Sequence, residues 1–564
     1  MSQHRTDPVK SQVTAARHAL RQGWQVVRHR GPSQVQFWFI ALVIGIAAGF
    51  AALFFRKGIT ALQTFVYGHD DVRELASHAA TLSWYWLLIV PTLGGLAVGL
   101  LLHWTTRDGR SRGVADVIEG AALNDGRVEH KEGLASAAAS LITLSTGGST
   151  GREGPVVHLA AVISSWVSTR LHADGITGRD LLGCAVAAAV SASFNAPIAG
   201  ALFALEVVLR HFALHAFAPI VIASVAGTVI NRLEFGDITE FSLPPEGGAL
   251  AFYVELPAFL ILGLVSGIVA VVLMRSVFLT DKIGTYLQDA TGLPPYLRPA
   301  VAGVLLGALA IWYPHIIGVG YQTTSAALTG SLLLHEAIVF AALKVIAVSI
   351  TMTGRMGGGI FSPALMIGAL VGLAFGLVAT GVFPEVSGSE TLYALAGMGA
   401  VAAAVLGAPI STTLIVFELT GDWQTGIAVM VSVSLSTAVS SRLVDRSFFL
   451  TQLEHRNVHL AAGPQAYLLA TVRVGRIMRP LGHAHAPPED DLWDMIADGK
   501  FLSASATLEE ALPILDRGAG GGFMPVVSPG SARTAPKLLG AVTHVDALKA
   551  FNRALAATAA EEHS

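Results

Sequence analysis

The segment Gly151-Arg152-Glu153-Gly154-Pro155 places two charged side chains between glycines, within a long apolar region. A charge at the centre of a bilayer costs about 2.5 kcal/mol or more, so this pair needs a chemical reason. Pro155 is suited to the first turn of a helix that continues through VVHLAAVISSW. The start of a helix carries unpaired N–H groups and a partial positive charge, and it can therefore bind an anion.

A second glycine-rich segment, GGGIFSP at Gly357–Pro363, opens the apolar stretch ALMIGALVG in the same way. Glycine lets a backbone approach a ligand closely and adopt turns that other residues resist. If both helix starts point at one place, they predict an anion site built largely from backbone amides.

Most of the chain is too apolar to face water. Of its 564 residues, 53% are hydrophobic and 13% are charged, whereas soluble domains have about 25% charged residues. Phe37–Phe55 has no charge over 19 residues, which is long enough to cross a hydrocarbon core of about 30 Å. The net charge of −3 gives no sign of nucleic-acid binding, and the one cysteine, Cys184, allows no disulfide within the chain.

The other apolar segments divide into spans and pieces that glycine and proline interrupt. Trp84–Thr106 and Leu256–Met274 are long, and Pro299–Tyr313 and Ile427–Val439 are shorter. The broken pieces are Leu134–Gly148, Val156–Val167, Leu181–Phe194, Ile198–Leu209, Ile360–Phe383 and Leu392–Leu406. Broken helices at membrane depth are tolerated only where protein or an aqueous cavity covers the exposed backbone. This pattern is more typical of a channel or transporter than of a receptor bundle.

An internal repeat relates two parts of the chain. APIAGALFALE at Ala196–Glu206 matches APISTTLIVFE at Ala408–Glu418 with an offset of 212 residues. GREGP and GIFSP, at 151–155 and 359–363, have nearly the same offset, 208 residues. The repeat predicts a duplication, and corresponding broken segments in two halves indicate a midplane binding site. It does not decide between a parallel and an inverted relation, and we expect the recurring glutamates, Glu206 and Glu418, to be structural anchors.

GREGP, FNAPIAGALFALE, GGGIFSP and GAPISTTLIVFELTGD occur in this order between Phe37 and Arg456. Together they resemble the CLC family of chloride channels and proton/chloride antiporters. The resemblance implies an all-α polytopic membrane domain over 35–456, an inverted repeat of broken, tilted helices with halves at about 35–235 and 250–456. It also implies a homodimer with one pore in each subunit and both termini in the cytoplasm. The basic flanks of the first span favour the same side for the N-terminal segment 1–34.

The resemblance identifies Glu153 as a gating glutamate, whose carboxylate can occupy an anion position at the helix starts. A chloride ion would displace this carboxylate, or protonation would neutralise it. We expect Arg152 to reach polar backbone or solvent. The positions that the resemblance assigns to the anion site are Arg112, Gly113, Gly151, Arg152, Gly154, Gly359, Ile360, Phe361 and Phe449.

One departure from the family pattern concerns the first anion motif, which here is SRGVAD at Ser111–Asp116. Arg112 falls where the family has a serine that coordinates the central anion. An arginine there could raise the local anion concentration or bind the anion too tightly for quick release. Alternatively, Arg112 points into the inner vestibule and a backbone N–H, such as that of Gly113, binds the ion.

Two further departures remove polar groups from the inner ion site. Val207 stands where the family's antiporters usually carry a proton-path glutamate, which weakens the case for proton exchange, although water could substitute. Phe449 takes the place of an inner tyrosine, so the ring lacks the hydroxyl that would contact the anion but could form an apolar gate. Chloride remains the expected ion, and selectivity among chloride, bromide, nitrate and fluoride stays open.

The C-terminal part, 457–564, resembles a single CBS domain on the cytoplasmic side. FLSASATLEEALPILDR predicts strand, turn and helix, FMPVV and KLLGAV predict strands, and HVDALKAFNRAL predicts a helix. About 20 residues from Arg479 look inserted. Because CBS units pair, two subunits could supply one pair across the dimer. Thr543 and Asp546 match a pattern that holds a nucleotide ribose in some members, and a purely structural role is the alternative.

From these patterns we expect a passive chloride channel of the inner (plasma) membrane, gated by Glu153, and not an enzyme. The alternative is a proton/chloride antiporter with an unusual inner proton path. The expected partners are chloride or other small monovalent anions, the lipid bilayer and a second copy of the chain, with no nucleic acid. No cofactor is required, although the C-terminal domain could bind an adenine nucleotide, and the 19 histidines form no evident metal cluster.

Overall fold

The computed structural model describes residues 34–562, except for 70, 72, 213, 237–240, 244–252, 457, 459, 461–468, 470–471, 484–485, 517–521 and 529–536. The expected basic segment 1–34 therefore lies outside the described residues, apart from its last residue. The same holds for most of the connection between the membrane part and the C-terminal unit.

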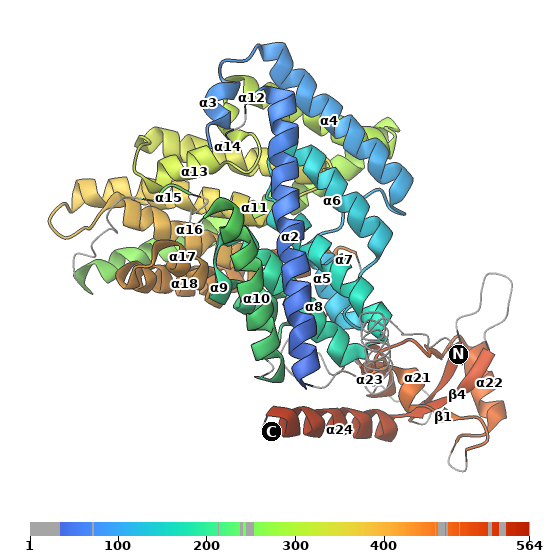
Figure 1. Cartoon of the computed structure of the whole chain (residues 1–564). Helices are drawn as coiled ribbons and strands as arrows, with labels where there is room; N and C mark the ends of the chain where they lie inside the picture. Colours follow the sequence, from blue (N-terminus) through green and yellow to red (C-terminus); the bar gives the residue numbers. More distant parts are fainter. Residues whose placement is uncertain are drawn as a thin grey trace, which may run out of the picture.

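The first half of the membrane part is a set of helices of very different lengths (Figure 1). They are α2 Gln34–Tyr67, α3 Leu75–Ala79, α4 Trp84–Thr105, α5 Val114–Leu123, α6 His130–Ser145, α7 Glu153–Leu171, α8 Gly175–Phe194, α9 Pro197–Phe203, the π-helix η1 Ala204–Leu209 and α10 Leu214–Phe235.

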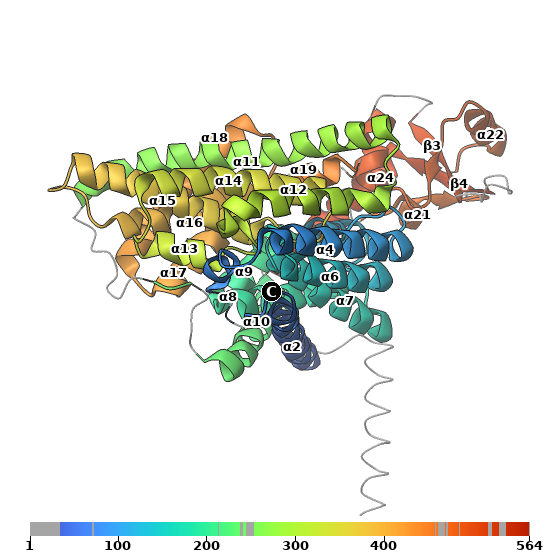
Figure 2. The same ribbon diagram turned by 90° about the horizontal axis from the view of Figure 1, so that it is seen from above.

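The second half also consists of helices of very different lengths. It comprises η2 Tyr253–Glu255, α11 Leu256–Thr291, η3 Pro295–Leu297, α12 Arg298–Trp312, η4 Pro314–Ile316, α13 Tyr321–Leu328, α14 Leu334–Thr353, α15 Phe361–Val382, α16 Glu390–Leu406, α17 Pro409–Thr420, α18 Trp423–Leu443 and α19 Phe448–Glu454. Figure 2 shows the helices of the first half, from blue to green, lying against those of the second half, from yellow-green to orange.

Eight of the described helices are long and apolar enough to cross a membrane. Shorter apolar helices, Pro197–Leu209, Glu390–Leu406 and Pro409–Thr420, do not reach that length. The chain therefore combines spanning helices with helices that end inside the protein, as the interrupted apolar segments predict.

Glycines bring the interior helices into backbone contact. A Cβ added to Gly368 on α15 would lie 2.4 Å from the carbonyl oxygen of Gly397 on α16. A Cβ on Gly397 would lie 2.5 Å from the carbonyl oxygen of Gly368. Small residues allow such approach in membranes, where helix association depends on close packing because lipid tails are as apolar as the side chains.

Two glutamates tie the halves together by reciprocal capping. Glu206 accepts hydrogen bonds from the backbone N–H groups of Ile410 and Ser411, at 3.0 and 2.7 Å. Glu418 accepts hydrogen bonds from the N–H groups of Ile198 and Ala199, also at 3.0 and 2.7 Å. When equivalent residues exchange equivalent contacts, the two units are related by a two-fold axis. The expected anchoring role of both glutamates is confirmed, since each caps a helix of the opposite repeat.

The C-terminal unit is a four-stranded sheet with helices. The strands are β1 Arg479–Pro480, β2 Leu502–Ser503, β3 Phe523–Ser528 and β4 Lys537–Thr543, in the order β1-β4-β3-β2. The helices are α21 Val474–Ile477, α22 Glu489–Ala497, α23 Leu508–Asp516 and α24 His544–Glu562. The predicted strand and helix segments are confirmed, and β1 and α22 belong to the stretch that looks inserted. Figure 1 shows α24 extending beneath the ends of α2 and α10.

Candidate anion site

The two glycine-rich helix starts meet, as the repeat predicts. The N–H of Gly151 donates to the carbonyl of Gly359 at 2.7 Å, and the N–H of Gly359 donates to the carbonyl of Gly151 at 2.8 Å. Glycine is needed here because a Cβ on Gly151 would lie 2.6 Å from Oε2 of Glu153. A Cβ on Gly154 would likewise lie 3.2 Å from the Cα of Gly359.

This pairing corrects part of the expected amide set. The N–H groups of Gly151 and Gly359 are engaged with each other, so in this arrangement they join the halves and do not face an anion. The first N–H groups of an α-helix have no partner within the helix. Ile360 and Phe361 stand at the start of α15. Their backbone N–H groups are therefore the donors available to bind an anion at this helix start.

Glu153 is the first residue of α7 and is almost completely buried. Its Oε1 accepts a hydrogen bond of 2.5 Å from the hydroxyl of Ser362 on α15. Its Oε2 is buried and has no hydrogen-bond partner among the described residues. A carboxylate from one half is thus held at the helix start of the other half, where an anion would be stabilised.

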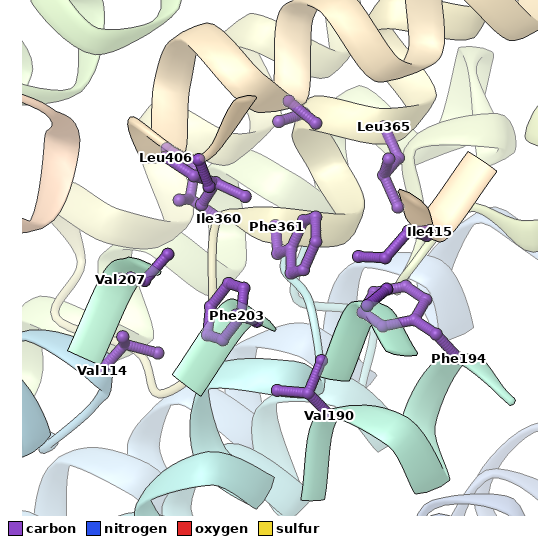
Figure 3. Packing of buried hydrophobic residues seen from close by; sticks show 14 of the residues in the cluster. Val114, Val190, Phe194, Phe203, Val207, Ile360, Phe361, Leu365, Leu406 and Ile415 are labelled. Carbon is purple, nitrogen blue, oxygen red and sulfur yellow. The ribbon is translucent and has the colours of Figure 1, made fainter. Parts of the chain in front are cut away.

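Glu153 lines a cavity of about 120 Å³ together with Gly154, Gly359, Ile360 and Phe361. The rest of its wall combines apolar side chains, among them Phe449 at the position expected for an inner gate, with charged side chains that include four arginines. Figure 3 shows Phe361 facing Phe203, and their ring centroids are 5.8 Å apart. An apolar wall keeps water low around a bound anion, which strengthens its interaction with the amides.

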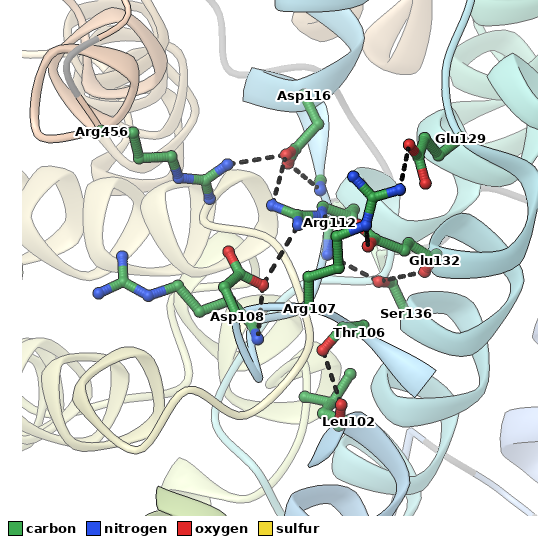
Figure 4. Close-up of polar contacts among 12 residues, drawn as sticks. Leu102, Thr106, Arg107, Asp108, Arg112, Asp116, Glu129, Glu132, Ser136 and Arg456 are labelled. Carbon is green, nitrogen blue, oxygen red and sulfur yellow. Dashed lines mark hydrogen bonds and ion pairs between the residues drawn. The ribbon is translucent and has the colours of Figure 1, made fainter. Parts of the chain in front are cut away.

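The side chain of Arg112 is held by acidic residues (Figure 4). Its Nε donates to Glu132 at 2.9 Å, its Nη1 to Asp116 at 3.4 Å and its Nη2 to Asp108 at 3.2 Å. Arg456 adds a second cation to this cluster, with Nη1 2.7 Å from the Asp116 carboxylate. Arg112 lines the Glu153 cavity, but three carboxylates already pair with its guanidinium, so its contact with the anion stays a prediction.

Gly113 is also engaged within the protein. Its N–H donates to Asp116 at 2.8 Å, so the start of α5 is capped by a carboxylate of its own first turn. The expected alternative, in which this N–H binds the ion, is not the arrangement in the structure. A capped helix start already has a negative charge next to it, and it attracts a second anion less strongly.

Arg152 lies away from the Glu153 cavity. Its Nη2 donates to the carbonyl of Ser193 at 3.1 Å, and its guanidinium lies 5.4 Å from the centre of the Tyr321 ring. The expectation that it reaches polar backbone is confirmed. Arg152 lines a different cavity, of about 210 Å³, together with Arg56 and Arg73. Arg152 is therefore not among the residues that line the Glu153 cavity.

Comparison with known proteins identifies the family. The family model described as "Voltage gated chloride channel" matches residues 94–441, which is more than half of the chain. The chain belongs to this family of voltage-gated chloride channels. A protein of Ralstonia nicotianae described as "chloride channel protein ClcB-like" is 33% identical over 398 residues, covering 70% of this chain and 91% of that protein.

Solved structures show the same fold as this family member. A slow cyanobacterial Cl⁻/H⁺ antiporter aligns with a TM-score of 0.66 and 21% identity, covering 74% of this chain and 97% of that one. A eukaryotic CLC transporter aligns with a TM-score of 0.63 and 18% identity, covering 94% of this chain and 89% of that one. The predicted fold class, an inverted repeat of broken helices with a small C-terminal α/β unit, is therefore confirmed.

Within this chloride channel family member, Val207 is buried in the apolar core on η1. It follows Glu206, whose two carboxylate oxygens are both taken by the start of α17. A valine carries no proton, and a carboxylate that caps a helix is fixed in place. Neither residue therefore offers a mobile proton at this position.

The suggested nucleotide residues of the family member are engaged with each other. The hydroxyl of Thr543 donates to Asp546 at 2.7 Å, and the same carboxylate forms a salt bridge with Arg479, 2.7 Å away. Partial burial raises the pKa of Asp546, but the hydrogen bonds from Arg479 and Thr543 outweigh it and keep the pKa below its usual value. Arg479 contacts both carboxylate oxygens of Asp546 in this structure, and ribose binding stays a prediction.

Sequence reasoning missed several charged or titratable residues around the site of this channel-family protein. Arg110 and Arg355 line the Glu153 cavity, and His158 is buried beside it on α7. Lys344 is fully buried on α14, and its Nζ donates to the carbonyl of Gly318 at 2.9 Å. One signal was present for His158, because it lies five residues after Glu153 on the same predicted helix. Arg110 directly precedes the Ser111–Asp116 motif and Arg355 lies two residues before Gly357–Pro363, but neither belongs to the motif itself. Lys344 occurs in a segment without a recognisable motif.

Proposed function

We propose that the chain forms a passive chloride channel in which Glu153 is the gate. The observation that supports passive transport is Val207, which is apolar and buried. Proton exchange would need a proton-carrying side chain at this position on the inner proton path. The buried surroundings of Val207 belong to the apolar core of the membrane part. Chloride would then move without an obligatory proton.

Conduction at this site would depend on exchange between the Glu153 carboxylate and chloride. The starts of α7 and α15 supply partial positive charge, and the amides of Ile360 and Phe361 can replace part of the water around the ion. Chloride in the cavity would compete with the carboxylate for this position, and protonation would neutralise the carboxylate and favour its release. The ion binds weakly enough to leave because no full positive charge is fixed at the helix starts.

Flux into liposomes tests the transport mode. The purified protein is reconstituted, an outward chloride gradient is imposed, and chloride efflux and internal pH are recorded together. We expect chloride efflux with no uphill proton movement. Proton uptake against its gradient, driven by chloride and abolished when the protein is absent, would reject the passive mode.

Proton/chloride exchange is the second candidate, and His158 favours it. Nδ1 of His158 lies 3.2 Å from the carbonyl of Gly113, so this nitrogen must carry the proton because a carbonyl only accepts. Nε2 is then an acceptor, and it is buried without a partner among the described residues. Five residues of helix place His158 about 7.5 Å along α7 from Glu153. A proton could pass between the acidic cluster around Asp116 and the gate by this route.

Substitution of His158 separates the two modes. If the protein exchanges protons, His158→Leu should stop proton movement and leave chloride flux. His158→Gln should have the same effect although it keeps a hydrogen bond to the carbonyl of Gly113. If the wild type moves no protons, the exchange candidate fails without further variants.

We propose the same assembly and location for this chain as the family resemblance implies. Two copies would each carry a pore, and the membrane part would lie in the inner membrane with both termini in the cytoplasm. The C-terminal unit would be a CBS domain that pairs with its copy across the dimer and has a structural role, because Asp546 is committed to Arg479. Cross-linking in membranes and protease access to the C-terminal unit in inverted vesicles test these statements.

A further inference from the structure

The guanidinium groups of two arginines in the Glu153 cavity have no acidic or hydrogen-bonding partner among the described residues. Arg110 and Arg355 both line this cavity. Within the part of the chain that the structure describes, neither guanidinium makes a hydrogen bond or an ion pair, and Nε of Arg355 is buried without a partner. Arg112 and Arg456, which line the same cavity, are instead held by acidic residues.

The nearby carboxylates cannot neutralise these two cations, because other arginines already hold them. The acidic groups within electrostatic reach of Arg355 are Asp281 and Asp108. Asp281 lies 2.7 Å from Arg298, and Asp108 lies 3.2 Å from Arg112. The cavity therefore has an excess of fixed positive charge, which raises the local concentration of anions.

The backbone of Arg355 supports a functional reason for its presence. Its φ is 56°, in the left-handed region that favours glycine and asparagine. It lies between the end of α14 and the glycines that lead into α15. An arginine is less suited to this conformation than glycine or asparagine. His172, Asn195 and Arg210 adopt the same conformation where helices end, and at Arg355 it places the side chain at the cavity wall.

Guanidinium groups prefer oxyanions over spherical ions. Their planar N–H fork matches two oxygens of one anion, and charge-assisted pairs of this kind are stronger than neutral hydrogen bonds. Chloride cannot accept such a bidentate pair. The presence of two uncompensated guanidiniums in one cavity therefore favours a small divalent oxyanion.

We propose that Arg110 and Arg355 form an oxyanion-binding site that takes a small inorganic divalent anion, such as sulfate or hydrogen phosphate. The cavity also includes Phe449, His455 and Arg456, which precede the C-terminal unit in the chain, so the site opens on the side of that unit. An oxyanion bound there would lie on the path to Glu153 and would block chloride from this side. The blocking step rests on the proposed channel function, and the binding step does not.

Calorimetry on the purified full-length protein tests the binding step. Sulfate is titrated into the protein in detergent without chloride, because sulfate keeps its charge over the pH range in which Glu153 could titrate. We expect one site per chain. Arg355→Asn should weaken sulfate binding about tenfold or more, since each hydrogen bond to a charged group contributes about 1.5–3 kcal/mol. Asparagine accepts the left-handed backbone, so this variant should fold.

Matched variants show whether the loss of sulfate binding is specific to the two cavity arginines. Arg355→Lys keeps the charge without the planar fork and should bind with intermediate affinity, and Arg110→Ala should weaken binding as Arg355→Asn does. Arg107→Ala removes an exposed arginine that does not line the cavity, and it should bind as the wild type does. Wild-type sulfate affinity in both Arg355→Asn and Arg110→Ala would overturn the site.

Two further measurements define the ligand and the block. Adenosine monophosphate, titrated in the same way, tests whether a phosphate attached to a nucleotide enters. If it binds and Arg355→Asn abolishes that binding, the restriction to inorganic anions is wrong. In liposomes, sulfate on the side of the C-terminal unit should slow chloride flux in the wild type but not in Arg355→Asn. Unchanged flux despite measured sulfate binding would overturn the block alone, and absence of chloride flux in the wild type would overturn the channel function and leave the binding result intact.

Discussion

Charged side chains inside the membrane part are held in different ways, and the difference separates structural residues from the gate. Arg112 is surrounded by carboxylates at 2.8 to 3.4 Å, so its charge is compensated. The ammonium group of Lys344 donates hydrogen bonds to the carbonyls of Ile316 and Gly318. Glu153 has one oxygen bonded to Ser362 and one without a partner among the described residues. An incompletely bonded buried charge is costly, and it is therefore easier to displace.

Replacement of Glu153 tests the gate. We expect Glu153→Ala to conduct chloride at all pH values and to lose the pH dependence of flux, because no carboxylate remains to compete with the ion. Glu153→Gln, which mimics the protonated side chain, should behave in the same way. Flux from liposomes between pH 4.5 and 7.5 measures both. A pH dependence that survives in Glu153→Ala would show that another group closes the pathway.

Replacement of Arg112 tests whether it has a structural role. Arg112→Ala leaves Glu132, Asp116 and Asp108 short of a partner, and loss of one partner of a buried ion pair costs about 3 kcal/mol. We expect a lower melting temperature in detergent and unchanged relative permeabilities for chloride, bromide and nitrate. Arg107→Ala, a change to an exposed arginine nearby, is the control and should melt as the wild type does. Altered permeability ratios in Arg112→Ala would return the residue to the ion path.

At the scale of the elements, helix starts differ in what lies next to them. The start of α5 is capped by Asp116, that of α9 by Glu418 and that of α17 by Glu206. The N-cap residues of α7 and α15 make no side-chain cap, and the carboxylate next to these starts is that of Glu153, which bonds Ser362 through one oxygen only. A capped start is structural because its positive end is neutralised, and an uncapped start can serve an ion.

The reciprocal caps predict equal costs in the two repeats. Glu206→Gln and Glu418→Gln each weaken two backbone hydrogen bonds to a charged acceptor, and each should destabilise the fold by about 1–2 kcal/mol. Thermal unfolding in detergent measures the effect, and the pH dependence of flux should not change. Glu336→Gln is a matched control, because Glu336 caps only its own exposed helix start at Leu333. A large loss in one repeat with none in the other would contradict the reciprocal arrangement.

At the scale of the whole molecule, the C-terminal segment holds both ends of α5. Arg456, which follows α19, binds Asp116 at the start of α5, 2.7 Å away. Arg473, at the entrance to the C-terminal unit, donates to the carbonyl of Leu123 at the end of α5, at 3.3 Å, and lies 3.8 Å from Asp125. Because α5 begins at the wall of the Glu153 cavity, the position of this helix depends on residues more than 300 positions later in the chain.

Shortening the chain separates these two contacts. A chain that ends after residue 456 keeps the Arg456–Asp116 pair, and we expect it to retain chloride flux. Full-length Arg456→Ala loses that pair and should conduct less, because Asp116 and the start of α5 are no longer restrained. Arg473→Ala is the control for the distal contact and should conduct normally. If the shortened chain fails while Arg456→Ala conducts normally, the C-terminal unit supports the pore by another route.

The sequence by itself determined the elements and their duplication. Apolar periodicity, glycine and proline located many of the helices, but α10 and α14 were not predicted and α2 and α11 extend well beyond the predicted spans. The repeat predicted that 151–155 and 359–363 would meet. It also identified Glu153 and assigned Glu206 and Glu418 to anchoring. These features could be predicted because hydrophobicity, helix starts and repeats are local or periodic properties of the chain.

Only the tertiary structure decided which charges compensate one another. Arg112 stands at an ion-site position in the sequence, yet its guanidinium bonds to Glu132, 20 residues later. Asp116 in turn bonds to Arg456, at the end of the membrane part. The same folding leaves the guanidinium groups of Arg110 and Arg355 without partners among the described residues, although nothing in their own segments distinguishes them from Arg112. An electrostatic interaction depends on distance in space, and pairs brought together across hundreds of residues leave no pattern in the sequence for local reasoning to detect.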